Sequence, residues 1–239
     1  VLRMQVLNDL LEARYEDIET DAELTAVVDT MGAGRDDRRL LEIVFDIYDK
    51  VQSHPDPARW MDEQERAFFP PEGADAGETA WGAFLLRDAE KTAEYWLERI
   101  NASRTIAGRD AVLEANYGPS LEETADGLRR LKNAAGESWD KAREALPIPF
   151  PTAGRKRGVE DEEAAEQVKS VRNLCKKQLD KLGERFDAGS EELMDDLRAV
   201  YPAVKGLFRL VREFGAAYRK EKTRRGMMDF SDLEHETVH

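Results

Sequence analysis

The last five residues of the chain carry two histidines and a glutamate at a spacing that can bind zinc. His235, Glu236 and His239 match H-E-x-x-H, which on a helix directs two imidazoles at one zinc ion and offers the glutamate as a general base. A catalytic zinc ion needs a third protein ligand, and the only other histidine, His54, lies in a proline turn. We therefore predict no metal ligands in this chain and keep a zinc metalloprotease only as a remote alternative.

The sequence lacks the motifs that bind nucleotide phosphates or activate a nucleophile. No G-x-x-x-x-G-K-[ST] stretch is present, and no acidic pair follows an apolar strand to hold magnesium. The three histidines form no Ser-His-Asp arrangement, and the single cysteine, Cys175, stands at an apolar helix position where a buried, inert thiol is expected. We predict no catalytic residues and no cofactor in this chain, which should neither hydrolyse ATP nor cut DNA.

Basic side chains that could bind a phosphate backbone concentrate near the C-terminus, although the net charge of the whole chain is −14. Residues 198–225 contain nine basic and two acidic side chains, a net charge of +7. Such a cationic flank would contact DNA electrostatically, without reading its sequence. The alternative is a solvated flank whose charges pair with the acidic N-terminal half. The candidate contacts on the flank are Arg198, Lys205, Arg209, Arg212, Arg219, Lys220 and Lys222.

A second basic group belongs to a proline-rich stretch in the middle of the chain. Residues 146–158 hold three prolines within five residues, followed by small and basic side chains, which favours an extended, mobile connector. Arg155, Lys156 and Arg157 are further candidate DNA contacts, and simple solvation is the alternative for all three.

One long helix is needed to carry the cationic flank. Apolar residues recur at steps of three and four, which places them on one side of a helix, with the basic residues on the neighbouring flank. The helix is expected to end at Gly226, and Ser231 or Asp232 to cap a further helix. The apolar stripe comprises Leu193, Leu197, Val200, Val204, Leu207, Val211, Phe214 and Tyr218.

Two stretches resemble a helicase family. The pattern F-x-x-x-Y-x-x-x-K in the long helix, followed by DFSDLE, resembles the DFxDL segment of UvrD-like superfamily-one helicases and is most similar to AddA-like helicase–nuclease proteins. The stretch from Gly34 to Glu63, where a helix ends at S-x-P-x-P before a tryptophan, is similar to AddA as well. The residues that carry the first pattern are Phe214, Tyr218, Lys222, Asp229, Phe230, Asp232 and Leu233.

The resemblance implies a place within a longer protein. Residues 1–226 would be the helical insertion called 1B, set in the first ATPase lobe, and residues 227–239 would begin the return into that lobe, as in an excised piece. The insertion would guide DNA. The parent would be an ATP-dependent DNA helicase and exonuclease that uses ATP and Mg²⁺, works with an AddB-like partner and acts in double-strand-break repair and recombination. Tyr218 and Phe230 are expected to be buried rather than to stack on bases.

Hydrophobic periodicity predicts an all-α fold, a multi-helix array or bundle, because no segment alternates as a strand does. Helices are expected at about 78–106 and 119–135, with a break at Gly108 or at residues 116–119, and a later helix should bury Leu174 and Cys175. No apolar run is long enough to span a bilayer, so we expect no membrane contact. A single cysteine is typical of the reducing cytoplasm, which we expect to be the location.

The second functional hypothesis is a stand-alone helical module that binds a partner protein through its acidic half, with the DFSDLE match accidental. The flanking reading frame separates the two hypotheses. A helicase fragment predicts a phosphate-binding loop encoded upstream of Val1 and further helicase motifs downstream of His239, whereas a stand-alone module predicts start and stop codons beside this segment.

Overall fold

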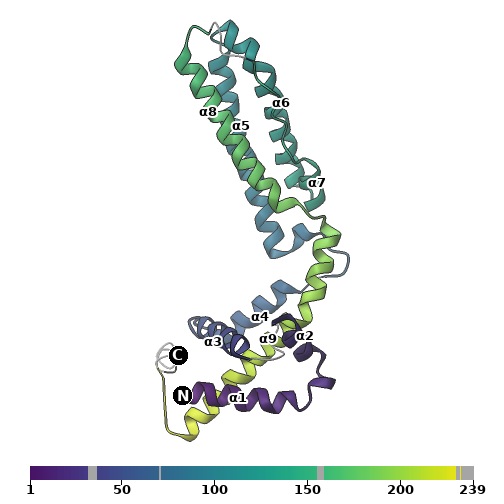
Figure 1. Cartoon of the computed structure of the whole chain (residues 1–239), viewed down its shortest axis with the longest axis vertical. Coiled ribbons are helices and arrows are strands. Elements are labelled where there is room, and N and C mark those ends of the chain that lie inside the picture. The colour runs from purple at the N-terminus through teal and green to yellow at the C-terminus, as the bar shows by residue number, and fades with distance from the viewer. Residues whose placement is uncertain (32–36, 70, 155–158, 230–231, 233–239) are drawn as a thin grey trace. The chain divides into compact units, whose positions relative to one another are not determined.

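The computed structural model describes residues 1–31, 37–69, 71–154, 159–229 and 232, and these residues form helices and no β-strand (Figure 1). The prediction of an all-α fold is confirmed. Within the described part, no helix has the length and apolar character that crossing a membrane requires. The α-helices are α1 (Leu2–Tyr15), α2 (Ala22–Met31), α3 (Arg38–Gln52), α4 (Pro57–Phe68), α5 (Ala80–Ala107), α6 (Ala111–Ala135), α7 (Trp139–Glu144), α8 (Glu162–Gly183) and α9 (Ser190–Arg224).

The chain divides into two compact units. Unit 1 comprises residues 1–71 and 195–239, and unit 2 comprises residues 72–194, so the division falls inside α9. Each unit buries side chains of its own and therefore has its own hydrophobic core. The predicted boundary between an insertion at 1–226 and a return segment at 227–239 stays a prediction.

In unit 1, α1–α4 pack against the C-terminal part of α9. Phe214 is fully buried at the centre, with its ring edge-on to Phe45 and Tyr48 at centroid distances of 5.4 and 5.0 Å. Tyr218 stacks on Phe214 at 5.7 Å, which confirms that this tyrosine is buried. The core of the unit is completed by Val6, Leu7, Leu11, Val27, Leu40, Leu41, Val44, Val51, Met61, Leu210 and Val211.

The turn between α3 and α4 is built as its prolines predict. Asp56 is the N-cap of α4 and its side chain accepts a hydrogen bond from the backbone N–H of Arg59 at 3.0 Å, with Pro57 in the first turn. The imidazole of His54 stacks on Trp60 at a centroid distance of 4.4 Å. The corner is therefore held both by a cap and by ring packing.

In unit 2, α5 lies against both α6 and α8 (Figure 1). The break after α5 falls at Gly108, and the expected break at residues 116–119 is wrong, because α6 continues through Pro119. A proline clashes with the Cβ of the residue before it when that residue is helical, and Gly118 has no Cβ. The glycine thus allows the proline inside the helix.

The described part of the proline-rich stretch, residues 146–154, is tied to α6. The hydroxyl of Thr124 donates to the carbonyl of Pro149 at 2.9 Å, and the hydroxyl of Ser120 donates to that of Pro151 at 2.8 Å. The N–H of Gly154 donates to the carbonyl of Asn116 at 2.9 Å. The predicted basic residues Arg155, Lys156 and Arg157 lie outside the described residues.

Two apolar residues that were predicted to be buried are exposed. Val200 in the predicted α9 stripe is 44% exposed, and Leu174 in α8 is 56% exposed. Around Val200, the buried positions are instead Met194 and Ala203, because the buried face of α9 is set by what packs against each stretch and not by one uniform stripe. Leu174 borders a groove of unit 2 and is not covered by a neighbouring helix.

Candidate nucleic-acid interface

The C-terminal end of α9 reverses the chain through a tight turn at Gly226. This glycine has a φ of +64°, a left-handed conformation that residues with a Cβ rarely adopt. The N–H of Met227 donates to the carbonyl of Lys222 at 2.9 Å, and the N–H of Gly226 donates to that of Thr223 at 3.1 Å. This pair of bonds is a Schellman motif, and it confirms the predicted end of the helix at Gly226.

Lys222 anchors the segment that follows this turn. Its side-chain ammonium donates to Asp229 Oδ2 at 2.8 Å and to Asp232 Oδ1 at 2.7 Å, and it lies 4.7 Å from the ring centroid of Tyr218. Lys222 is only 4% exposed. A buried ammonium needs both a counter-charge and hydrogen-bond acceptors, and the two aspartates supply both.

The same two aspartates also cap each other's backbone. The N–H of Asp232 donates to Asp229 Oδ1 at 3.1 Å, and the N–H of Asp229 donates to Asp232 Oδ2 at 2.9 Å. Reciprocal bonds at this spacing form a capping box, with Asp229 at the N-cap position. The cap is therefore Asp229 and not Ser231 or Asp232, the two residues that the sequence pattern favours. Phe230, Ser231, Leu233 and residues 235–239, which include the H-E-x-x-H match, lie outside the described residues.

The ionisation of this anchor follows from its geometry. Burial opposes the charged form of Lys222, but hydrogen bonds from its ammonium to Asp229 and Asp232 outweigh burial and raise the pKa of Lys222. Burial likewise works against the carboxylate of Asp229, and the Lys222 ammonium prevails, so that the pKa of Asp229 is lowered. Burial together with the charge of Asp229 raises the pKa of Tyr218. Lys222 and Asp229 are therefore both charged at neutral pH.

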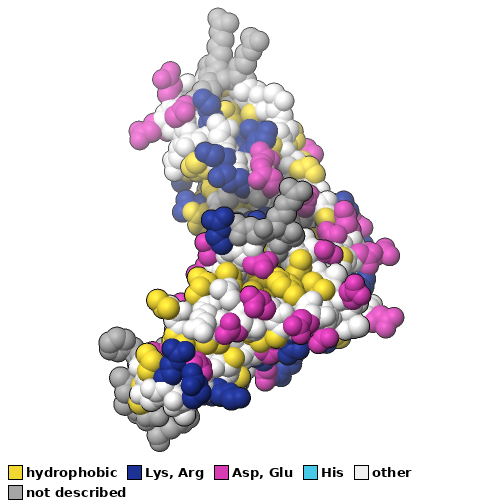
Figure 2. Space-filling model, turned by 60° about the horizontal axis from the view of Figure 1, so that its bottom comes forward, with side chains coloured by type: hydrophobic (Ala, Val, Ile, Leu, Met, Phe, Trp, Pro, Cys, Tyr) yellow, Lys and Arg dark blue, Asp and Glu magenta, His cyan; other side chains and the backbone are white. Residues whose placement is uncertain are grey.

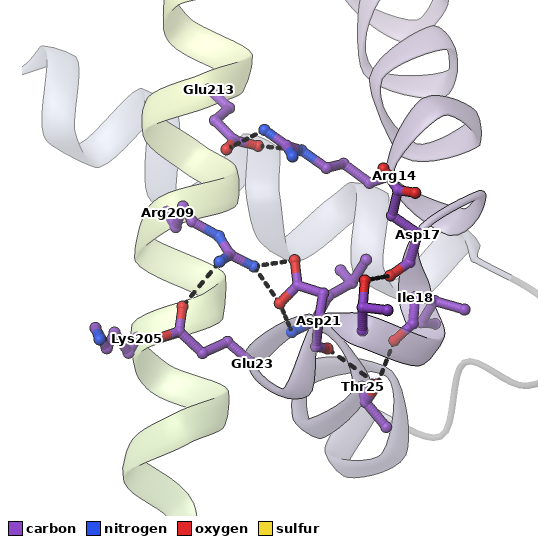
Figure 3. A network of polar contacts seen from close by, with 11 residues as sticks. Arg14, Asp17, Ile18, Asp21, Glu23, Thr25, Lys205, Arg209 and Glu213 are labelled. Atoms are coloured by element: carbon purple, nitrogen blue, oxygen red, sulfur yellow. Dashed lines mark hydrogen bonds and ion pairs between the residues drawn. The ribbon is translucent and has the colours of Figure 1, made fainter.

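Lys205 and Arg209, on the predicted cationic flank, pair with carboxylates of the N-terminal part (Figure 3). Lys205 lies 2.8 Å from Glu23, and Arg209 donates to Asp21 at 2.7 Å and lies 3.0 Å from Glu23. The hydrogen bond from Arg209 lowers the pKa of Asp21 despite partial burial. On the same face of α9, Glu213 accepts two hydrogen bonds from Arg14 of α1.

Arg212 and Arg198 are also paired. Arg212 donates to Glu65 at 2.7 Å and to Asp62 at 2.8 Å, both on α4, and Arg198 pairs with Asp195 one turn earlier on α9. These contacts match the alternative in which flank and acidic half neutralise each other. For Lys205, Arg209 and Arg212, binding a phosphate would require exchanging an existing carboxylate partner.

Uncompensated positive charge remains at the end of α9. Arg219 and Lys220 are exposed and make no ion pair with any other residue that the structure describes. Arg224 and Arg225 share one carboxylate, that of Glu221, and their hydrogen bonds hold the pKa of Glu221 at about 2. These four cations against one carboxylate leave a net charge of +3, and we call them the α9 basic end. Arg224 and Arg225 were not among the predicted DNA contacts, although the basic run in the sequence contains them.

The α9 basic end borders a groove in unit 1. The groove has a volume of 940 Å³ and is lined by Arg219 and Asp232, the exposed Met227 and Met228, and the corner at Pro55–Ala58. Figure 2 shows one face of the molecule on which Lys and Arg side chains form small groups among scattered carboxylates and apolar patches. Local clusters, and not the net charge of −14, therefore decide where a polyanion can bind.

The described residues contain no catalytic arrangement. No group of three or more His, Cys, Asp or Glu side chains in this part could hold a metal ion. Cys175 is buried, and burial raises the pKa of its thiol to about 12, so the thiolate needed for nucleophilic chemistry does not form near neutral pH. What the arrangement offers is an electrostatic surface.

Comparison with known proteins finds relatives along almost the whole chain. The AddA protein of Acetivibrio thermocellus, an ATP-dependent helicase/nuclease component, is 32% identical over 240 residues, which cover 98% of this chain and 19% of that protein. The proteins of the same name from Ruminiclostridium cellulolyticum and Pelotomaculum thermopropionicum are 31% and 32% identical, with the same coverage. The chain thus spans about a fifth of the length of the curated relatives it matches. No family model matches the chain.

Proposed function

Because this chain matches a fragment of AddA, a component of the ATP-dependent helicase/nuclease, as its DFSDLE motif predicted, we propose that it is the accessory DNA-path domain of such an enzyme. In this proposal the domain corresponds to the helical 1B insertion and has no catalytic chemistry of its own. It binds the phosphate backbone electrostatically and guides DNA toward the rest of the parent protein.

The observation that carries the proposal is the α9 basic end. A net charge of +3 persists there in a chain whose net charge is −14, while the cations farther back on α9 are paired with carboxylates. Exposed cations without partners attract phosphates without first giving up another ion pair. Arg219, Lys220, Arg224 and Arg225 are therefore the proposed primary contacts.

The anchor at Lys222 gives this surface a fixed relation to the following segment. Lys222 is held by Asp229 and Asp232, so it sets the path by which the chain leaves α9. In the parent, this path would lead back into the first ATPase lobe, where ATP and Mg²⁺ would bind. The parent would work with an AddB-like partner in double-strand-break repair and recombination.

The proposal is tested by DNA binding at varied salt concentration. We expect a fluorescent forked DNA to bind the 239-residue chain with an affinity that falls steeply between about 20 and about 200 mM NaCl, because binding releases counterions. Changing Arg219, Lys220, Arg224 and Arg225 to Gln should reduce the slope of log affinity against log salt by about three to four.

A matched control removes four exposed or half-exposed cations elsewhere, through Arg109→Gln, Arg129→Gln, Arg130→Gln and Lys141→Gln. This control should leave the slope for forked DNA close to that of the unaltered chain. Equal loss of slope in both variants would mean that binding follows overall charge and would overturn the assignment to the α9 basic end.

A further inference from the structure

A second cationic groove lies within unit 2, between α5 and α8 (Figure 1). It has a volume of 550 Å³, and its α8 side carries Lys177, Lys181 and Arg185. Its α5 side carries Tyr95 and Trp96, and a smaller hollow beside it is lined by Lys91 and Tyr95. Cations and an aromatic ring therefore border the same depression.

The positive charge of this groove is mostly uncompensated. Lys91, Lys177 and Lys181 are exposed and form no ion pair or hydrogen bond through their side chains with other described residues. Asp88 is the carboxylate among the lining residues, and it is already paired with Arg185 at 2.8 Å. Three lysine ammonium groups are thus available to an anionic ligand.

The apolar side chains of the groove are exposed where the fold does not require it. Leu174 is 56% exposed and Tyr95 is 46% exposed, although each stands on a long helix with a well-buried face. The sequence pattern predicts Leu174 to be buried, and no packing within unit 2 explains its exposure. An apolar contact site beside cations suits a ligand that has both negative charge and a flat apolar surface.

The floor of the groove is rigid. Trp96 is buried and its Nε1–H donates to Gln178 Oε1 of α8 at 2.9 Å, which joins the two helices. Tyr95 packs edge-on against Trp96 at a centroid distance of 5.1 Å, and the guanidinium of Arg99 lies 4.5 Å from the centroid of the Tyr95 ring. The tyrosine is thereby held at the rim, with a cation next to its ring.

We propose that this α5–α8 groove binds single-stranded DNA, with phosphates at Lys91, Lys177 and Lys181 and a base against Tyr95 and Leu174. Lys177 and Lys181 are one helical turn apart, so their ammonium groups can follow a backbone along α8. The choice of a nucleic acid over other polyanions rests on the proposed DNA-path function, whereas the position of the site rests on the groove alone. The aromatic ring favours a single strand, because only unpaired bases expose their faces for stacking.

The test titrates the 239-residue chain into fluorescein-labelled oligo(dT) of about 20 nucleotides at several salt concentrations. We expect Lys91→Gln, Lys177→Gln and Lys181→Gln together to reduce the slope of log affinity against log salt by about two, since each single-strand phosphate contact contributes about 0.7. The variant Arg109→Gln, Arg130→Gln and Lys141→Gln removes equal charge outside the groove and should keep the slope.

Stacking is tested separately at Tyr95. Tyr95→Ala should weaken oligo(dT) binding at least about fivefold, whereas Tyr95→Phe should retain it, because the phenyl face stacks equally well. An oligonucleotide carrying 5-iodouracil should crosslink to the peptide that contains Tyr95, as detected by mass spectrometry. Unchanged binding by Tyr95→Ala, or by the triple lysine variant, would overturn the site, as would its saturation by a poly-glutamate peptide in preference to oligo(dT).

The two proposals fail independently. Loss of the α9 basic end should weaken forked DNA binding and leave crosslinking at Tyr95 intact. If the α9 variant binds forked DNA normally while the groove variants lose oligo(dT), then the assignment to α9 is wrong and the groove stands. If the reverse is found, the groove assignment is wrong.

Discussion

At the scale of single residues, the feature with the largest consequence is the pairing of Lys222 with Asp229 and Asp232. One ammonium group neutralises two carboxylates, and the carboxylates also cap each other's backbone N–H groups. Each of the three side chains depends on the other two, because any one removed leaves an unpaired charge in a half-buried site. The Lys222 position in the F-x-x-x-Y-x-x-x-K pattern is thus explained by structure rather than by a direct contact with DNA.

Lys222→Met should lower the free energy of unfolding by about 2 kcal/mol. Removing one partner of a fully buried ion pair costs about 3–5 kcal/mol. The loss is smaller here because the side chains of Asp229 and Asp232 are 35% and 26% exposed and water can solvate them. Urea unfolding followed by circular dichroism measures the change. Lys220→Met, two residues earlier and exposed, is the control and should change stability by less than about 0.5 kcal/mol.

The anchor also predicts how stability depends on pH. The pKa of Asp229 is lowered from 3.8, so its contribution is present above that pH and is lost as the pH falls through the folded-state value. The pKa of Lys222 is raised from 10.5, so its contribution is present below that pH and is lost as the pH rises through the folded-state value. Urea midpoints should therefore show a plateau between these limits.

Asp229→Asn isolates the acidic limb of this profile. The variant should be less stable than the unaltered chain at neutral pH and should lose less stability on acidification, so that the two curves converge at low pH. Parallel curves down to about pH 3 would show that other carboxylates, such as the Asp21 that pairs with Arg209, control the acidic limb.

At the scale of elements, α9 organises unit 1 through close backbone contact as well as side-chain packing. Gly206 lies against α2, and a Cβ at this position would be 2.6 Å from the carbonyl oxygen of Glu23 and 2.8 Å from Val27. The absence of a side chain lets the two helices approach. That approach brings Asp21 and Glu23 within reach of Lys205 and Arg209 (Figure 3).

Gly206→Ala should therefore destabilise the protein, by about 1–2 kcal/mol, against the usual gain of about 1 kcal/mol for this change inside a helix. The backbone of Glu23 cannot move aside as a flexible side chain could. Gly183→Ala is the matched control, because a Cβ there meets nothing within 4 Å, and it should be neutral or stabilising. Thermal unfolding of both variants gives the comparison, and equal behaviour would contradict the close approach of α2.

At the scale of the whole molecule, the chain is two hydrophobic cores joined by the continuous helix α9. Unit 1 is centred on Phe214, and unit 2 buries Leu121, Leu128 and Trp139. Charge is arranged on a similar scale, because carboxylates of α2 and α4 neutralise the middle of α9 and leave its basic end and the α5–α8 groove positive. Neither surface could be found from the net charge.

Phe214→Ala should loosen one unit selectively. Removing a fully buried phenylalanine side chain costs about 3–5 kcal/mol. Hydrogen exchange followed by mass spectrometry should show faster exchange in α1, α3 and the C-terminal part of α9, while α5 and α6 keep their protection. Leu121→Ala should give the opposite pattern, and equal acceleration throughout the chain in both variants would show that the two cores unfold as one.

The sequence by itself determined the features that depend on neighbours along the chain. Helical periodicity predicted the all-α fold, Asp56 and Pro57 predicted the start of α4, Gly226 predicted the end of α9, and DFSDLE predicted the relatives. Each of these signals is local, because caps, turns and the helical repeat act over a few residues.

Only the tertiary structure decided which charges are neutralised and which apolar residues are left exposed. Arg209 and Arg219 look alike in sequence, but Arg209 meets Asp21, 188 residues away, and Arg219 meets no described carboxylate. Leu174 stands in the apolar pattern of α8 and yet borders an open groove. Pairing and exposure depend on which elements approach each other in space, and one helix's periodicity carries no information about the partner that covers it.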